Sequence, residues 1–208
     1  MIEMENVSKM ICGNRVLQNV TLNMERGKIY GIKGKNGSGK SMLLRMIAGL
    51  LVPDIGTVKV NGISLEKNRA FPVSIGILIN VPGFIGRYSA FKNLKILADI
   101  NGRISTDQIR DILSRLQLNP YDKKPYKRYS LGMKQKVGIA AAVMENPEVI
   151  LLDEPFNALD EEAIEVVHEI IREMKARGST IVLTCHDSEE LMRCVDEMIY
   201  ISAGRIVE

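Results

Sequence analysis

The sequence is poor in several features that mark particular classes of protein. Its 208 residues contain no tryptophan, and aromatic residues make up only 5% of the chain, so a platform for stacking nucleic-acid bases is not expected. The three cysteines, Cys12, Cys185 and Cys194, form no C-x-x-C pair, which is typical of reduced thiols and not of disulfides or a zinc site. The net charge of +3 is too small to indicate a nucleic-acid partner.

Long apolar runs and targeting signals are also missing. The longest uncharged apolar runs, such as residues 137–144, fall far short of the ~20 residues of a membrane-spanning helix. The first six residues lack the basic and apolar segments of a signal peptide, so we expect a cytoplasmic chain. Apolar residues make up 46% and charged residues 25%, as in ordinary globular proteins, and the length predicts one domain with room for an insertion.

The pattern of apolar residues predicts an α/β protein with a helical insertion. The first third predicts an antiparallel ribbon and one helix, with strands expected at 2–7, 16–24, 28–33, 57–60 and 75–79 and the helix at 41–51. Three helical stretches follow one another at 89–100, 105–116 and 131–144. Strands and helices then alternate at 149–152, 161–177, 180–184, 188–194 and 197–202, which favours a sheet buried on both faces.

One glycine-rich segment carries a strong chemical signal. Residues 34–41 (Gly-Lys-Asn-Gly-Ser-Gly-Lys-Ser) match the pattern G-x-x-x-x-G-K-[ST] between an apolar strand and a helix. In that context backbone N–H groups close around phosphate oxygens, and the helix N-terminus adds positive potential. Lys40 would reach the β- and γ-phosphates of a nucleotide, and the hydroxyl of Ser41 would hold Mg²⁺.

Polar residues also stand at the ends of two later apolar strands. Asp153 and Glu154 follow the run 149–152, and His186 follows the strand at 180–184. Because the carboxyl ends of parallel strands border the ligand crevice of open α/β sheets, we expect Asp153 to hold Mg²⁺ and Glu154 to polarise an attacking water. His186 would either contact the γ-phosphate beside the same crevice or be an ordinary surface or core histidine, whereas His168 is expected on the solvated side of its helix.

A third segment has two interpretations from the residues alone. Ser130 and Gly132 lie at the start of the helix expected at 131–144. A hydroxyl, free N–H groups and the helix dipole at that point make a second site for an anion. A serine in this place is also an ordinary N-cap, and the residues do not decide between the two.

These motifs, in this order, resemble the nucleotide-binding domain of ABC transporters over essentially the whole chain. Residues 129–135 (Tyr-Ser-Leu-Gly-Met-Lys-Gln) resemble a variant of the LSGGQ signature, residues 157–160 resemble the D-loop, and His186 takes the place of the switch histidine. With segments 75–79 and 82–84, the signature variant is similar to the bacitracin- and lantibiotic-type export ATPases.

The resemblance implies a fold and a division of the chain. The fold is an α/β P-loop NTPase of the ABC type, with a RecA-like core, an N-terminal antiparallel β subdomain and a helical insertion. The whole chain, 1–208, would form one ABC ATPase domain. Its nucleotide-binding core would comprise 1–84 and 146–208, and its helical signature subdomain 85–145.

The resemblance also implies the composition of an ATP site. Two such domains pair head to tail in the family, and each ATP lies between the P-loop of one chain and the signature of the other. Glu154 would be the general base, His186 would position the γ-phosphate and water, and Mg²⁺ would be held by Ser41, Asn80 and Asp153. On the same chain, ATP would be bound by Ile11, Val16, Gly34, Asn36, Gly37, Ser38, Gly39, Lys40, Ser41 and Met42. Across the interface, ATP would be bound by Ser130, Leu131 and Gly132, with Asp160 linking the two sites.

Several positions depart from the family pattern, among them Lys35, which stands where proline is common and adds a cation near the phosphates. Ile11 replaces the aromatic residue that stacks on adenine, and it would pack on the purine without aromatic stacking. Asn80 replaces the Q-loop glutamine and is one methylene shorter, so it would reach the metal through a water. Leu131 and Met133 replace a glycine and a glutamine of the signature, as they do in the branch that this chain resembles.

The function that the resemblance implies is ATP hydrolysis in an ABC exporter. The chain would form a homodimer around two ATP molecules and drive a separate membrane permease, which would hold it at the inner face of the cell membrane. Peptide antibiotics or related hydrophobic compounds would be the cargo. Segment 81–92 would either face that permease or belong to the core of the helical insertion. A soluble non-transport ABC ATPase and a hydrolysis-impaired nucleotide-binding module are the alternatives.

Overall fold

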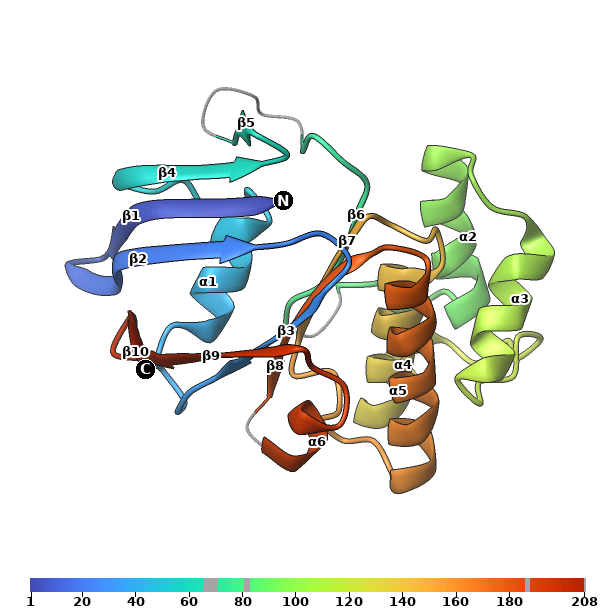
Figure 1. Cartoon of the computed structure of the whole chain (residues 1–208). Helices are drawn as coiled ribbons and strands as arrows, with labels where there is room; N and C mark the ends of the chain where they lie inside the picture. Colours follow the sequence, from blue (N-terminus) through green and yellow to red (C-terminus); the bar gives the residue numbers. More distant parts are fainter. Residues whose placement is uncertain (66–70, 81–82, 186–187, 208) are drawn as a thin grey trace.

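The strands of the protein form two separate sheets. The computed structural model describes residues 1–65, 71–80, 83–185 and 188–207 (Figure 1). The first sheet is antiparallel, with the order β2-β1-β4-β5. Its strands are β1 (Ile2–Ile11), β2 (Asn14–Met24), β4 (Ile55–Val60) and β5 (Ile63–Ser64). The antiparallel ribbon expected from the alternating pattern is therefore present, with longer strands than the pattern indicated.

The second sheet is six-stranded and mostly parallel. Its order is β10-β9-β3-β8-β7-β6, and only β10 runs antiparallel to its neighbour. The strands are β3 (Ile29–Lys33), β6 (Ile75–Leu78), β7 (Val149–Asp153), β8 (Thr180–Cys185), β9 (Glu197–Ser202) and β10 (Arg205–Val207). Every residue of β8 is buried, as expected for a central strand covered on both faces. The loop before α1 and the acids at the end of β7 consequently meet at the carboxyl edge of this sheet.

Helices cover both faces of the second sheet. The helix α1 (Lys40–Ile47) lies between the two sheets, whereas the other helices lie on the opposite face or beside it (Figure 1). These helices are α2 (Ala90–Asn101), α3 (Thr106–Arg115), α4 (Leu131–Val143), α5 (Glu161–Ala176) and α6 (Ser188–Met192). A short 3-10 helix, η1 (Tyr126–Arg128), precedes α4. None of the helices in the described ranges is long and apolar enough to cross a bilayer.

The helix starts follow from capping side chains in the sequence. Ser89, Ser105 and Ser130 each accept a hydrogen bond from a backbone N–H in the first turn, and Ser105 forms a complete capping box with Gln108. These local interactions fix the starts of α2, α3 and α4. The helix expected at 41–51 ends earlier, at Ile47, because the chain turns at Ala48 and Leu50 is already exposed.

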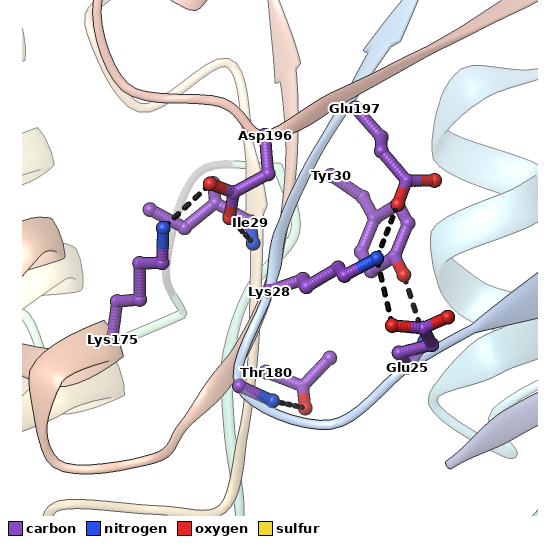
Figure 2. Close-up of polar contacts among 9 residues, drawn as sticks. Glu25, Lys28, Ile29, Tyr30, Lys175, Thr180, Asp196 and Glu197 are labelled. Carbon is purple, nitrogen blue, oxygen red and sulfur yellow. Dashed lines mark hydrogen bonds and ion pairs between the residues drawn. The ribbon is translucent and has the colours of Figure 1, made fainter.

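A polar network fastens the start of β3. The ammonium group of Lys28 lies 2.7 Å from a carboxylate oxygen of both Glu25 and Glu197 (Figure 2). The backbone N–H of Ile29 donates to the carboxylate of Asp196 at 2.8 Å. These contacts connect β3 to the residues just before and at the start of β9, so the strand that leads into the glycine-rich loop is held at its entry.

The expectation for His168 was wrong. Its exposed fraction is 0%, and its ring stacks on Phe156 with the ring centroids 4.7 Å apart. Its Nε2 atom lies 2.8 Å from a carboxylate oxygen of Glu190 on α6. The sequence position alone indicated the polar side of α5, but the packing of α6 against that side buries the imidazole.

Candidate functional site

The glycine-rich segment forms a tight loop between β3 and α1. Gly39 is the N-cap of α1 and has a φ of 111°, a conformation that side chains with a Cβ rarely adopt. A Cβ on Gly39 would also lie 2.9 Å from the carbonyl oxygen of Val16. The loop therefore brings its backbone N–H groups to the start of a helix, where the dipole favours an anion.

Lys40 places a buried cation inside this loop. Its exposed fraction is 5%, and its ammonium group donates to the carbonyl oxygens of Gly34 at 2.8 Å and Lys35 at 3.3 Å. The same ammonium lies 3.9 Å from a carboxylate oxygen of Glu154. A phosphate entering the loop would thus meet a desolvated positive charge, which forms the strong class of hydrogen bonds with anionic oxygens.

A cavity of about 670 Å³ opens over the loop. Its volume is in the range of small-molecule sites. Of the residues predicted to bind ATP, it is lined by Ile11, Val16, Asn36, Gly37, Gly39, Lys40, Ser41 and Met42, and Glu154 lines it as well. Sequence reasoning missed its other polar lining residues, which are Asn14, Arg15, Gln18 and Arg45. Their positions in β2 and α1 are set by the folding of the first sheet over the loop, and no motif marks them.

Two residues of the predicted phosphate loop lie behind this cavity. A Cβ on Gly34 would lie 2.3 Å from the carbonyl oxygen of Ile201, so the glycine serves the packing of the loop against β9. The side chain of Ser38 is buried, and its hydroxyl oxygen has no hydrogen-bond partner within the described ranges. Neither residue lines the cavity, and both are packed inside the loop.

The predicted metal ligands meet in a second, adjoining cavity of about 300 Å³. Ser41, Asn80 and Asp153 all line it, as does Glu154. Hydroxyl, amide and carboxylate oxygens are the ligands that Mg²⁺ prefers, and Mg²⁺ usually keeps open positions for phosphate oxygens and water. No cluster of three or more His, Cys, Asp or Glu side chains suited to a metal occurs in the part of the chain that the structure describes. The residues present therefore fit a magnesium ion that is shared with a bound phosphate.

Thr184 orients the two acids at the end of β7. Its hydroxyl donates to the carboxylate of Asp153 at 2.6 Å and accepts from the backbone N–H of Glu154 at 2.9 Å. Sequence reasoning missed this residue. The sequence does contain a signal for it, because Thr184 is a polar residue near the end of an apolar strand. The structure pairs β8 with β7 so that Thr184 lies opposite Asp153.

Two neighbouring amide side chains hold Glu154, one from the turn that follows it and one from α4. The amide of Asn157 donates to that carboxylate, and the amide of Gln135 donates to the carbonyl oxygen of Glu154 at 2.9 Å. Glu154 itself has a φ of 51°, which is an uncommon conformation for a residue other than glycine and is often found at functional sites. The carboxylate is therefore directed into the site by its neighbours.

The signature residues lie apart from the loop cavity of the same chain. Ser130 caps α4 by accepting from the N–H of Met133 at 3.2 Å, and a role of the same residue in binding an anion stays a prediction. Asp160 caps α5 in the same way. Leu131 is 59% exposed and lines the smaller cavity. Neither Ser130, Gly132 nor Asp160 lines either cavity.

Two further predictions concern the edges of the site. His186 lies outside the described residues. In the segment expected to face a partner or the core, Phe84 and Phe91 pack against the core cluster. Ile85 is 43% exposed, so the two aromatic residues follow the core interpretation and Ile85 points to solvent.

Comparison with known proteins places the chain in a family. Residues 17–157 match the family model described as ABC transporter. The chain is 42% identical to an uncharacterized ABC transporter ATP-binding protein, YybJ, of Bacillus subtilis, over 99% of this chain and 94% of that protein. It is 34% identical, over 100% of its length, to the bacitracin transport ATP-binding protein BcrA of Enterococcus faecalis and the lantibiotic transport ATP-binding protein SrtF of Streptococcus pyogenes, covering 68% and 89% of those proteins.

Solved structures agree with this assignment. A dimeric structure of MJ0796, a bacterial ABC transporter cassette, superposes with a TM-score of 0.90 at 27% identity, over 100% of this chain and 97% of that chain. A dimeric post-hydrolysis state of MJ0796 bound to ADP and Pi gives a TM-score of 0.89 at the same identity. The fold class predicted from the sequence is confirmed. The chain belongs to the ABC transporter family, as an ATP-binding protein related to the bacitracin and lantibiotic transport ATP-binding proteins.

Proposed function

We propose that this chain hydrolyses MgATP and thereby drives a separate membrane permease in export. The observation that carries the proposal is the meeting of Lys40, Ser41, Asp153 and Glu154 around two adjoining cavities, with Ser41 and Glu154 lining both. A phosphate-binding cation, oxygen ligands for a metal and a directed carboxylate are the parts that phosphoryl transfer to water requires.

The residues divide the chemistry among them. The loop N–H groups and Lys40 would bind the β- and γ-phosphates, and Ser41 and Asp153, with Asn80 beside them, would hold Mg²⁺. When bound, Mg²⁺ supplies neutralisation of the phosphate charge. Glu154 would accept a proton from the attacking water. The oxygen of that water would bond to the γ-phosphorus while the bond from this phosphorus to the bridging oxygen of ADP breaks. Lys40 would stabilise the charge on the γ-phosphate oxygens, and His186 would position the water.

We further propose that the working form is a head-to-tail homodimer. Ser130, Gly132 and Asp160 lie outside the loop cavity of their own chain, and the similar cassette MJ0796 is dimeric. A second chain would bring Ser130, Leu131 and Gly132 to the γ-phosphate. The chain would then divide as expected, with 1–84 and 146–208 as the nucleotide-binding core and 85–145 as the helical signature subdomain.

The partner and the cargo follow from the relatives. Two similar proteins are named for bacitracin and lantibiotic transport, which supports export of peptide antibiotics or related hydrophobic compounds. A separate permease would then hold this chain at the cytoplasmic face of the membrane. The exposed Ile85 is a candidate contact for it.

A trapped dimer tests this proposal. Glu154→Gln keeps the size of the side chain and removes the base, so we expect a dimer with bound ATP that hydrolyses about 10²–10⁴-fold more slowly than the wild type. Size-exclusion chromatography with light scattering, with and without MgATP, measures the dimer. Lys40→Ala is the matched control, and it is expected to lose tight nucleotide binding and to remain monomeric. A Glu154→Gln chain that hydrolyses ATP at the wild-type rate would remove Glu154 from the role of base.

A further inference from the structure

His168 is a buried polar residue that the ATP site described above does not use. It lies on α5 with an exposed fraction of 0%. One ring nitrogen, Nδ1, is buried without a hydrogen-bond partner among the described residues. A buried nitrogen of this kind costs stability, so an apolar side chain would serve the packing of α5 at least as well. The presence of an imidazole here therefore calls for a role other than packing.

One face of the imidazole is connected to the segment that carries Glu154. The ring stacks on Phe156 with centroids 4.7 Å apart and an angle of 29° between the planes. Phe156 is itself buried and comes two residues after Glu154. Asn157, the next residue, donates to the Glu154 carboxylate. The stack thus restrains the short turn that aims this carboxylate.

The other side of the imidazole is connected to α6. Its Nε2 lies 2.8 Å from a carboxylate oxygen of Glu190, which also accepts from Arg193 at 3.3 Å. Arg193 in turn pairs with Glu165, one turn before His168 on α5. In the sequence, α6 begins soon after β8, the strand whose Thr184 holds Asp153. The contact of His168 with Glu190 and the Arg193–Glu165 ion pair therefore join α6 to α5, and the stack on Phe156 joins α5 to the turn after Glu154.

We propose that His168 is a positioning residue for ATP hydrolysis, which links the turn 154–157 to α6 through Phe156 and Glu190. The inference rests on the proposed ATPase function. His168 lines neither of the two cavities, so it does not touch the nucleotide. Loss of the contacts of His168 with Phe156 and Glu190 should leave the Glu154 carboxylate less precisely oriented and lower kcat. The affinity for ATP should stay the same.

Two substitutions separate positioning from packing. His168→Leu keeps an apolar contact with Phe156 and removes the N–H toward Glu190. We expect kcat to fall about tenfold with KM for ATP within about twofold, because small misplacements of a reacting group act on the chemical step. We also expect a melting temperature at or above that of the wild type. His168→Gln, which can still donate to Glu190, should recover most of kcat although its melting temperature should be lower.

Further variants complete the test. Glu190→Leu should lower kcat as His168→Leu does, and the double variant should lower it no further, because both remove one link. Glu169→Gln, on an exposed neighbour in α5, is the control with unchanged kcat. A wild-type kcat in His168→Leu, or a His168→Gln chain no more active than His168→Leu, would overturn the inference alone. A wild-type chain without ATP turnover would overturn the proposed function and this inference together.

Discussion

At the scale of single residues, neighbouring polar groups orient the side chains that line the two cavities. Asp153 and Glu154 face the site, but their orientation comes from the Thr184 hydroxyl and the Asn157 amide. Lys40 is likewise held by two carbonyl oxygens of its own loop. Such pre-organisation avoids reorientation during the reaction and is a large source of rate enhancement.

Thr184 offers a direct test of this pre-organisation. Thr184→Val keeps the shape of the side chain but removes the donor to Asp153 and one acceptor for the Glu154 N–H. We expect kcat to fall roughly tenfold or more and the free energy of unfolding to fall by about 1–2 kcal/mol. Steady-state kinetics and urea denaturation measure the two effects. Thr184→Ser retains the hydroxyl and should restore activity, and an equally inactive Ser variant would count against the role of the hydrogen bonds.

At the scale of secondary-structure elements, α4 is fitted closely against the turn after β7. A Cβ on Gly132, in the first turn of α4, would lie 2.4 Å from the carbonyl oxygen of Ala158. The backbone of the signature segment therefore contacts the backbone of the D-loop segment in the same chain. This close approach leaves no room for a larger residue, because the atom that a Cβ would meet is a backbone carbonyl oxygen and not the end of a flexible side chain.

We therefore expect Gly132→Ala to move α4 away from this turn. Inserting one methyl group into such a contact costs about 1–3 kcal/mol of unfolding free energy, which chemical denaturation measures. Gly86→Ala is the matched control, since a Cβ there would make only an ordinary contact of 3.4 Å with Lys127. Equal stability of the two variants would show that the close approach does not constrain the signature helix.

The sequence predicts these elements unequally. The starts of α2, α3 and α4 follow from local serine caps, and the buried strands β7 and β8 follow from continuous apolar runs. The short strands β5 and β10 were not expected, because their pairing with β4 and β9 depends on neighbours and not on their own pattern.

The candidate site shows the same limit. Ser41, Asn80 and Asp153 share a cavity, as the P-loop pattern and the strand ends indicate. Arg15 and Gln18 line the larger cavity only because the first sheet folds over the loop. His168 was misplaced for a related reason, since α6 and Phe156 bury it through contacts that no local pattern contains.

At the scale of the whole molecule, the polar network at the start of β3 links stability to pH. Burial raises the pKa of Asp196, but the Lys175 ammonium and the Ile29 N–H outweigh it, so the pKa lies below its ordinary value of 3.8 (Figure 2). Between these two values the unfolded chain binds more protons than the folded chain. The contribution of Asp196 to stability is therefore complete above the ordinary pKa and is lost as the pH falls through the folded value.

Asp196→Asn should consequently be less stable than the wild type at pH 7, and the difference should shrink at about pH 3. Urea denaturation at both pH values measures it. The isosteric amide keeps the size of the side chain and an acceptor for the Ile29 N–H. Any part of the stability difference that depends on pH therefore comes from the charge of Asp196. A difference of the same size at both pH values would assign the loss to packing and not to the ion pair with Lys175.

The turnover of ATP per chain as a function of protein concentration tests most directly the proposal that two chains together form each ATP-hydrolysing site. In the proposed dimer Ser130 and Gly132 would reach the nucleotide only from a second chain, so we expect turnover per chain to rise with concentration. We also expect Glu154→Gln to lower this turnover about 10²–10⁴-fold over the same range. Turnover per chain that is independent of concentration down to the limit of detection, or that stays at the wild-type rate in Glu154→Gln, would contradict the proposed two-chain site.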